Sequence, residues 1–200
     1  MATVLATLNS DLAALSASVL PGMVEIRNGK RGIGAGTVWH AEGLVLTNAH
    51  VVERGNLHVT TWDGRTAPAH VLAVDKERDL AALRVELTGL PTIALGDSRR
   101  LRPGDMVVAF GHPWGVAGAA TAGIVISTGN QLADFAAGER EWIAASLRLR
   151  PGHSGGPMVD THGRLVGINT LMNGPQVGAA VPVHVVVGFL KEKWQGSEEN

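Results

Sequence analysis

The stretch Arg150-Pro151-Gly152-His153-Ser154-Gly155-Gly156-Pro157 sets one serine among three glycines and two prolines. A serine in such surroundings has an exposed hydroxyl, and the glycines leave backbone N–H groups free to face a ligand. The loop can therefore hold both a nucleophile and an oxyanion hole. Because Gly155, Gly156 and Pro157 would break a helix at once, the serine is not expected to open one.

A serine hydroxyl is a weak nucleophile until a base removes its proton, and that base must itself be oriented. The sequence offers both partners upstream of Ser154. His50 lies in Leu46–Val52, at the end of an apolar strand, where the ring would be held in place. Asp79 directly precedes the apolar run Leu80–Leu83, which could bury it beside the ring. The three residues predict a site for nucleophilic catalysis.

Short apolar runs typical of β-strands lie on both sides of residues 86–102. Turn signals of Gly, Asn and Asp-Gly separate these runs. The segment 86–102 is the least strand-like part of the chain and is the natural linker. The predicted strands are Val24–Ile26, Ile33–Trp39, Leu44–Thr47, Leu57–Trp62, His70–Val74 and Leu80–Val85, then Met106–Phe110, Ala120–Ser127, Trp142–Leu147, Met158–Val159, Leu165–Asn169 and Val177–Val181.

A helix is expected at each end of the strand series. Leucines at helical spacing predict an amphipathic helix over residues 3–19 that lies on the core, with an oligomerisation arm as the alternative. A second helix begins after Pro182. We therefore expect an all-β fold of two six-stranded β-barrels with an N-terminal and a C-terminal helix. The expected division is 1–20 for the first helix, 21–90 for the first barrel, 91–102 for the linker, 103–182 for the second barrel and 183–200 for the last helix and tail.

The composition excludes several classes of function. The 200 residues carry a net charge of -1 and no long basic run, so nucleic acid is not an expected partner. The absence of cysteine excludes thiol catalysis and Cys-type zinc sites, and the eight histidines show no metal-ligand spacing, so no metal is expected. The five tryptophans are scattered along the chain, which favours core packing over a binding stripe.

The N-terminal residues show no targeting signal. Residues 1–20 hold no Lys or Arg and are interrupted by Asn9, Ser10 and Asp11, so no signal peptide is expected. No membrane span is expected either. The sequence predicts a cytoplasmic protein, unless it is trimmed from an exported precursor.

Three blocks, Thr47–Val52, Asp79–Leu83 and Gly152–Pro157, occur in the order of the catalytic blocks of chymotrypsin-like serine proteases. The chain resembles that family, and within it the high-temperature-requirement (HtrA, or Deg) branch, from about Val19 to Phe189. Three ordered blocks are far more specific than any one alone. Further matching blocks are Ala94–Ser98, Leu101–Asp105, Ala109–Gly115, Thr121–Val125 and Gly167–Thr170.

The resemblance implies a role for each residue of the three blocks. His50 is the general base and then the general acid, Asp79 orients it, and Ser154 is the nucleophile. The backbone N–H groups of Gly152 and Ser154 form the oxyanion hole. The resemblance implies a serine endopeptidase of protein quality control that acts through an acyl-enzyme, without a cofactor.

The side chain before the scissile bond is expected to enter an apolar pocket. Because no Asp or Glu occurs at the expected lining positions, we predict a preference for small or medium apolar side chains. The expected partners are unfolded or extended polypeptides, which can pair with a strand edge beside the site. The protein is expected to be a monomer or a homotrimer. The expected lining residues of the pocket are Leu149, Leu171, Met172, Asn173 and Val177.

The sequence departs from the family pattern in three ways. His153 stands where this branch usually has Asn, and it cannot serve as a carboxylate for a new N-terminus. The segment between Val24 and Ile33 is too short for the regulatory loop of some members, and no PDZ domain follows residue 200. These features leave either a minimal protease or a fragment.

Two alternatives to an active protease stay open. One is a latent or non-catalytic peptide-binding or chaperone-like module whose loop near Gly152 is collapsed at rest. The other is an esterase of the α/β-hydrolase type, since Gly152-x-Ser154-x-Gly156 also fits its nucleophile elbow. That fold needs a helix directly after the serine and the acid and histidine further along the chain.

Overall fold

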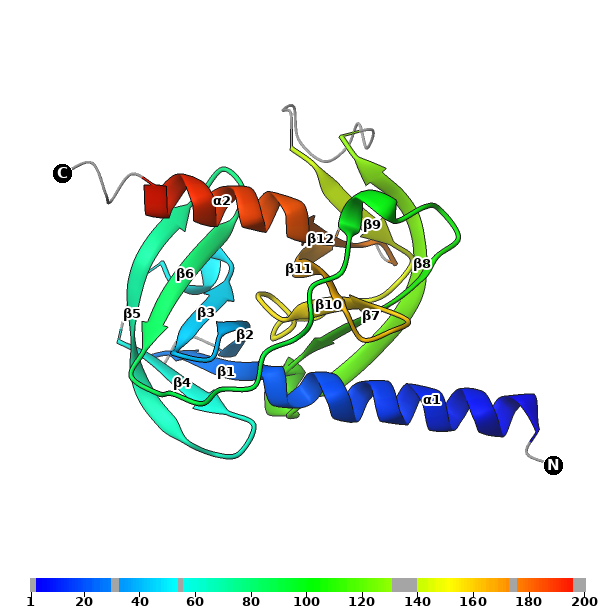
Figure 1. The fold of residues 1–200 in the computed structure, drawn as a ribbon, viewed down its shortest axis with the longest axis horizontal. Helices are drawn as coiled ribbons and strands as arrows, with labels where there is room; N and C mark the ends of the chain where they lie inside the picture. The colour runs from blue at the N-terminus through cyan, green and yellow to red at the C-terminus, as the bar shows by residue number, and fades with distance from the viewer. Residues whose placement is uncertain (1–2, 30–32, 54–55, 131–139, 173–175, 196–200) are drawn as a thin grey trace.

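A computed structural model describes residues 3–29, 33–53, 56–130, 140–172 and 176–195. Helix α1 (Val4–Val19) precedes twelve strands, and helix α2 (Val183–Gln195) follows them (Figure 1). The first six strands are β1 (Met23–Asn28), β2 (Ile33–His40), β3 (Leu44–Thr47), β4 (Leu57–Thr61), β5 (Thr66–Asp75) and β6 (Leu80–Val85). The second six are β7 (Met106–Gly111), β8 (Ala119–Gly129), β9 (Trp142–Ala145), β10 (Pro157–Asp160), β11 (Leu165–Met172) and β12 (Gly178–Pro182).

Each set of six strands closes into an antiparallel barrel. The neighbours run β1-β2-β3-β6-β5-β4 in the first barrel and β10-β11-β12-β9-β8-β7 in the second. Closure gives every strand a hydrogen-bonded neighbour on each side over at least part of its length. The predicted all-β fold of two six-stranded barrels with a helix at each end is confirmed.

Period-two patterning fills the barrel interiors. In β4, Leu57, Val59 and Thr61 are buried, and the residues between them are more exposed, as expected of a strand with one face toward a core. Val24, Val45 and Leu83 belong to the core of the first barrel. The core of the second barrel contains Val107, Val125, Ile143 and Met158.

The two barrels meet along a surface that carries the loop around Ser154. The Ala35 N–H in β2 donates to the Ser154 carbonyl at 2.8 Å, and the Thr37 hydroxyl donates to the Gly155 carbonyl at 3.1 Å. A methyl group at Gly155, whose φ is +83°, would lie 2.1 Å from the Ala35 carbonyl oxygen. The first barrel therefore fixes the backbone that carries the serine of the second.

Strand β5 begins at Thr66, earlier than the predicted start at His70. The cause lies at Pro68, which pairs with His58 of β4, whereas pairing with β6 begins only at Ala69. Proline has no N–H to give a strand and is tolerated where one side of the strand is unpaired. The proline masked the first part of a genuine strand.

Helix α1 contacts the barrels only through its C-terminal half. Val19 is fully buried and Leu12 and Leu15 pack against the core, whereas Val4 and Leu5 are 86% and 76% exposed. Figure 1 shows the helix extending away from the barrels. The prediction of a helix that lies on the core is therefore right for one half and wrong for the other.

The N-terminal helix bears on the prediction of no membrane span by its length and composition alone. Among the described residues, Val4–Gly22 is one helical stretch that is long and apolar enough to cross a membrane, and it is mostly exposed. Its single charged residue is Asp11. A signal sequence near an N-terminus meets the same criteria of length and composition.

The tryptophans do not share one environment. Trp142 is buried at 3% exposure, as core packing requires. Trp62 and Trp114 are 46% and 74% exposed, so the prediction of core packing is wrong for these two. The side chain of Trp194 lies outside the described residues.

Candidate active site

Strand pairing brings His50 and Asp79 together. Thr47 of β3 pairs with Ala81 of β6, so the residues just beyond these strand ends lie side by side. His50 stands in a short 3-10 turn three residues after Thr47, and Asp79 stands two residues before Ala81. The His50 Nδ1 lies 2.9 Å from Asp79 Oδ2 and 3.0 Å from Oδ1.

The carboxylate of Asp79 is fixed from several directions. The His50 N–H donates to Oδ1 at 3.2 Å, the Thr170 hydroxyl donates to Oδ2, and the Asn48 side chain donates to the Asp79 carbonyl at 2.9 Å. Asp79 has a φ of +54°, a strained conformation for a residue with a side chain. These contacts hold the carboxylate in one orientation toward the ring of His50.

The pKa values of this pair move in opposite directions. Burial raises the pKa of Asp79, but hydrogen bonds from His50 and Thr170 outweigh it and hold the pKa below its ordinary value. The hydrogen bond to Asp79 raises the pKa of His50 above its ordinary value, against the effect of burial. Asp79 is thus ionised near neutral pH, and His50 is a stronger base than a free imidazole.

Ser154 belongs to the second barrel and shares a groove with His50. The groove has a volume of about 720 Å³ and is lined by Ala49, His50, Pro151, Gly152 and Ser154, among others. The Ser154 hydroxyl donates to the Thr170 carbonyl at 3.0 Å. Thr170 therefore contacts the serine through its carbonyl and the aspartate through its hydroxyl.

A tight turn over Arg150–His153 shapes the backbone before Ser154. The His153 N–H donates to the Arg150 carbonyl at 2.9 Å, Pro151 is the second residue of the turn, and Gly152 is the third with φ +105°. Proline followed by a residue of positive φ is typical of a type II turn. Among the described residues, the N–H groups of Gly152 and Ser154 have no hydrogen-bond acceptor, so both are free to bind a ligand.

Two buried histidines support this turn from behind. His153 is 1% exposed, and its Nδ1 lies 3.2 Å from both the N and the O of Arg150. The His112 N–H donates to the Gly152 carbonyl at 2.8 Å. Burial lowers the pKa of both imidazoles, so both are neutral near pH 7.

The structure describes only part of the expected substrate pocket. The Leu149 N–H contacts the Met172 Sδ at 3.0 Å, and Leu149 is buried beside Gly178. Val177 is half-buried, while the side chain of Leu171 and the whole of Asn173 lie outside the described residues. The residues that line the 720 Å³ groove include none of these five, so their role stays a prediction.

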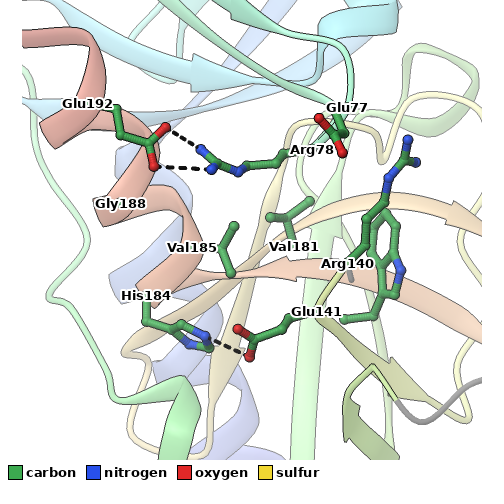
Figure 2. Close-up of a pocket in the computed structure, with 10 residues that line it drawn as sticks. Glu77, Arg78, Arg140, Glu141, Val181, His184, Val185, Gly188 and Glu192 are labelled. Atoms are coloured by element: carbon green, nitrogen blue, oxygen red, sulfur yellow. Dashed lines mark hydrogen bonds and ion pairs between the residues drawn. The ribbon is translucent and has the colours of Figure 1, made fainter. Parts of the chain in front are cut away.

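A second pocket, of about 390 Å³, lies beside helix α2 and is lined by charged side chains (Figure 2). The Arg78 guanidinium donates to both oxygens of Glu192, at 2.6 and 3.1 Å, and His184 Nε2 lies 3.0 Å from Glu141. The first pair ties α2 to the turn that carries Asp79. The pocket contains none of the three reactive residues, so we assign it a structural role.

Two residues that contact the site were not singled out from the sequence. Thr170 and Asn48 lie within the blocks that carry the family resemblance, but a local pattern does not show which distant residue they touch. Thr170 reaches Asp79 across 91 positions of sequence. In the described part of the chain, no group of three or more His, Asp or Glu could hold a metal ion.

Comparison with known proteins gives one family and a consistent set of relatives. Residues 34–168 match the trypsin-like peptidase domain. The chain is 36% identical over 156 residues to the probable periplasmic serine endoprotease DegP-like of Chlamydia pneumoniae, covering 76% of this chain and 31% of that protein. It is 36% identical over 163 residues to the mitochondrial serine protease HTRA2 of Drosophila pseudoobscura pseudoobscura, covering 79% and 38%.

A solved structure extends the same likeness to three dimensions. The HtrA-type protease AlgW with decapeptide superposes with a TM-score of 0.82 and 28% identity, covering 92% of this chain and 67% of that one. The chain spans about a third of the length of the two curated relatives named above, 31% and 38%.

Proposed function

This chain belongs to the trypsin-like peptidases, in their HtrA branch, and on that premise we propose that it is a serine endopeptidase of extended or unfolded polypeptides. The observation that carries the proposal is the 2.9 Å contact between His50 Nδ1 and Asp79 Oδ2 in the groove that also exposes Ser154. An oriented base beside a serine is the arrangement that acyl transfer needs.

The reaction begins with attack by Ser154. Its Oγ bonds to the carbonyl carbon of the substrate while His50 Nε2 takes the hydroxyl proton. The carbonyl oxygen becomes negative and accepts hydrogen bonds from the N–H groups of Gly152 and Ser154. Asp79 stabilises the imidazolium through Nδ1 without taking its proton.

The tetrahedral adduct then collapses. The bond between carbon and nitrogen breaks, and His50 gives its proton to the leaving amine, which leaves an acyl-enzyme on Ser154. Water then attacks the acyl-enzyme: its oxygen bonds to the acyl carbon while His50 removes its proton, the bond from that carbon to Ser154 Oγ breaks, and His50 returns the proton to the serine. The products are a carboxylate and an amine, and the enzyme is regenerated.

The substrate is proposed to lie extended along the groove. An extended peptide can pair its backbone with a neighbouring strand, so folded proteins would be poorer substrates. We keep the predicted preference for a small or medium apolar side chain before the scissile bond, since Leu149 and Met172 are close together at its expected pocket. The solved AlgW structure contains a decapeptide, so AlgW binds a polypeptide, and this supports a polypeptide as the ligand proposed here.

One observation favours the latent, peptide-binding alternative. The Ser154 hydroxyl donates to the Thr170 carbonyl, and no hydrogen bond joins it to His50, both of which are described residues. The hydroxyl must turn from Thr170 toward His50 before its proton can be removed. Catalytic hydrogen bonds often form only when substrate is bound, so this geometry is also that of a resting protease.

Incubation of the purified protein with unfolded casein and, separately, with a fluorophosphonate probe tests the proposed function. We expect casein fragments and a covalent adduct that peptide mass spectrometry maps to Ser154. Protein that is folded by circular dichroism but neither cleaves casein nor takes the probe would support the latent module instead. Prior heat denaturation of the enzyme, which should abolish labelling, separates site-directed reaction from non-specific phosphonylation.

The raised pKa of His50 predicts how activity depends on pH. Since only neutral His50 can accept the serine proton, kcat/KM should rise with pH and reach half its maximum above the ordinary histidine value of about 6.5. A profile of kcat/KM from pH 5 to 9 measures that midpoint. A midpoint below 6.5 would contradict the inferred effect of Asp79 on the ring.

Cellular location and assembly stay predictions. The names of the two curated relatives place one in the periplasm and the other in the mitochondrion. The apolar N-terminal helix is compatible with export, so the predicted cytoplasmic location is one of two proposals. The exposed half of α1 is equally compatible with the predicted monomer or homotrimer.

A further inference from the structure

Trp114 is exposed in an unusual conformation. Its side chain is 74% exposed, and its φ of +56° makes it one of two described non-glycine residues with positive φ, the other being Asp79. Strained backbone conformations concentrate at functional sites, and a large exposed aromatic side chain marks a binding surface more often than a core. Exposing this indole on a strained backbone is unfavourable, so we infer that Trp114 serves a function at the surface.

Arg150 stacks on the indole ring. The centre of its guanidinium lies 4.9 Å from the ring centroid of Trp114. Arg78 and Arg164 each pair with a carboxylate, but no carboxylate of the described residues lies within ion-pair distance of Arg150. A guanidinium that contacts an indole through its face can still offer its N–H edge to a carboxylate.

The stacked pair lies directly beside the proposed oxyanion hole. Arg150 begins the turn that contains Gly152. The segment before Trp114 packs on the same glycine: the His112 N–H donates to its carbonyl, and a methyl group on Gly152 would lie 2.8 Å from Pro113 Cα. Neither side chain lines the 720 Å³ groove itself, but both belong to segments that contact Gly152, which does line it.

The turn that carries Trp114 packs against the first barrel. The side chain before that bond is expected to point toward Leu149 and Met172. The 3-10 turn Pro113–Gly115 packs instead against β2, whose Ala35 binds the Ser154 carbonyl. An extended substrate whose side chain before the scissile bond fills the expected pocket would therefore continue past Ser154 toward β2 and Trp114.

We propose that Arg150, held by Trp114, forms a subsite for an acidic side chain, Asp or Glu, on the leaving-group side of the scissile bond. The inference rests on the proposed endopeptidase function and adds a substrate preference to it. The indole keeps the guanidinium in place and covers one of its faces, which strengthens its interaction with a carboxylate. Acidic residues within the first three positions after the scissile bond should therefore speed cleavage.

Three pairs of internally quenched peptides test the subsite. The two members of a pair differ only in Glu or Gln at the first, second or third position after the scissile bond. In at least one pair, the wild type should cleave the Glu peptide with about tenfold higher kcat/KM, the effect of one charge-assisted hydrogen-bonded pair. Arg150→Gln should bring that ratio to about one, and Arg150→Glu should bring it below one, because the new carboxylate repels the Glu peptide.

Arg148→Gln is the matched control, because Arg148 is an exposed arginine two residues away and should leave the Glu-to-Gln ratio unchanged. Trp114→Leu should lower the ratio, and Trp114→Phe should keep more of it. Equal cleavage of Glu and Gln peptides by an active wild type, or an unchanged ratio in Arg150→Gln, would overturn the subsite. A wild type that cleaves no peptide and takes no fluorophosphonate would overturn the proposed function first, and the subsite with it.

Discussion

Asp79→Asn is expected to lower kcat by about 10⁴-fold while the protein stays folded, the size of effect seen when the acid of such a triad is replaced by its amide. In the wild type the carboxylate accepts the Nδ1 proton of His50 and leaves Nε2 free to act as base. An Asn side chain can instead donate to Nδ1, which moves the ring proton to Nε2. The histidine would then have no lone pair to offer Ser154.

The matched control for this variant is Asp75→Asn. Asp75 ends β5 and accepts the Arg78 N–H at 2.9 Å, so it belongs to the same turn as Asp79 but does not touch His50. We expect it to keep nearly full activity. Measured kcat values and thermal unfolding midpoints for both variants separate loss of chemistry from loss of the turn. Activity of Asp79→Asn within tenfold of the wild type would rule out Asp79 as the orienting carboxylate.

The meeting of His50 and Asp79 could be predicted from the sequence because the determinants are local. Each residue follows or precedes a clear apolar strand, and once those two strands pair, Thr47 opposite Ala81 brings the two side chains into contact. The six strands on each side of the linker were recognisable for the same reason, since turn residues separate short apolar runs. The largest difference in bounds is the start of β5, where Pro68 suppressed the strand signal, and β11 runs three residues past the predicted end at Asn169.

Contacts that depend on the approach of the two barrels could not be predicted in this way. Thr170 reaches Asp79 from the other barrel, and nothing near Thr170 in the sequence indicates its partner. The exposure of Trp114 is a similar case. Tryptophan is usually buried, and the exposed position of this one depends on the packing of the preceding residue, Pro113, on Gly152. The free half of α1 was missed because apolar spacing predicts an apolar face but not what covers it.

Gly152→Ala is expected to lower kcat by about 10²- to 10³-fold, the effect of losing one oxyanion donor. The φ of +105° disfavours any side chain, and the added methyl would lie 2.4 Å from the His112 carbonyl oxygen. Since that oxygen belongs to the backbone, the turn itself must move, and the Gly152 N–H moves with it. The variant should lower kcat, because the steps that generate negative charge on the carbonyl oxygen become slower, and it should change KM much less.

Gly104→Ala separates the strain of the backbone from the loss of the donor. Gly104 has nearly the same φ, +101°, but nothing lies within 4 Å of an added methyl. Gly104→Ala should lose about 1 kcal/mol of unfolding free energy, because a side chain is forced to a positive φ, and Gly152→Ala should lose more, because its methyl also meets the His112 carbonyl oxygen. Only Gly152→Ala should lose affinity for a peptide boronic acid, whose tetrahedral adduct with Ser154 needs the oxyanion hole. If Gly104→Ala lost as much activity, or if Gly152→Ala bound the boronic acid as tightly as the wild type, the Gly152 N–H would not be an oxyanion donor.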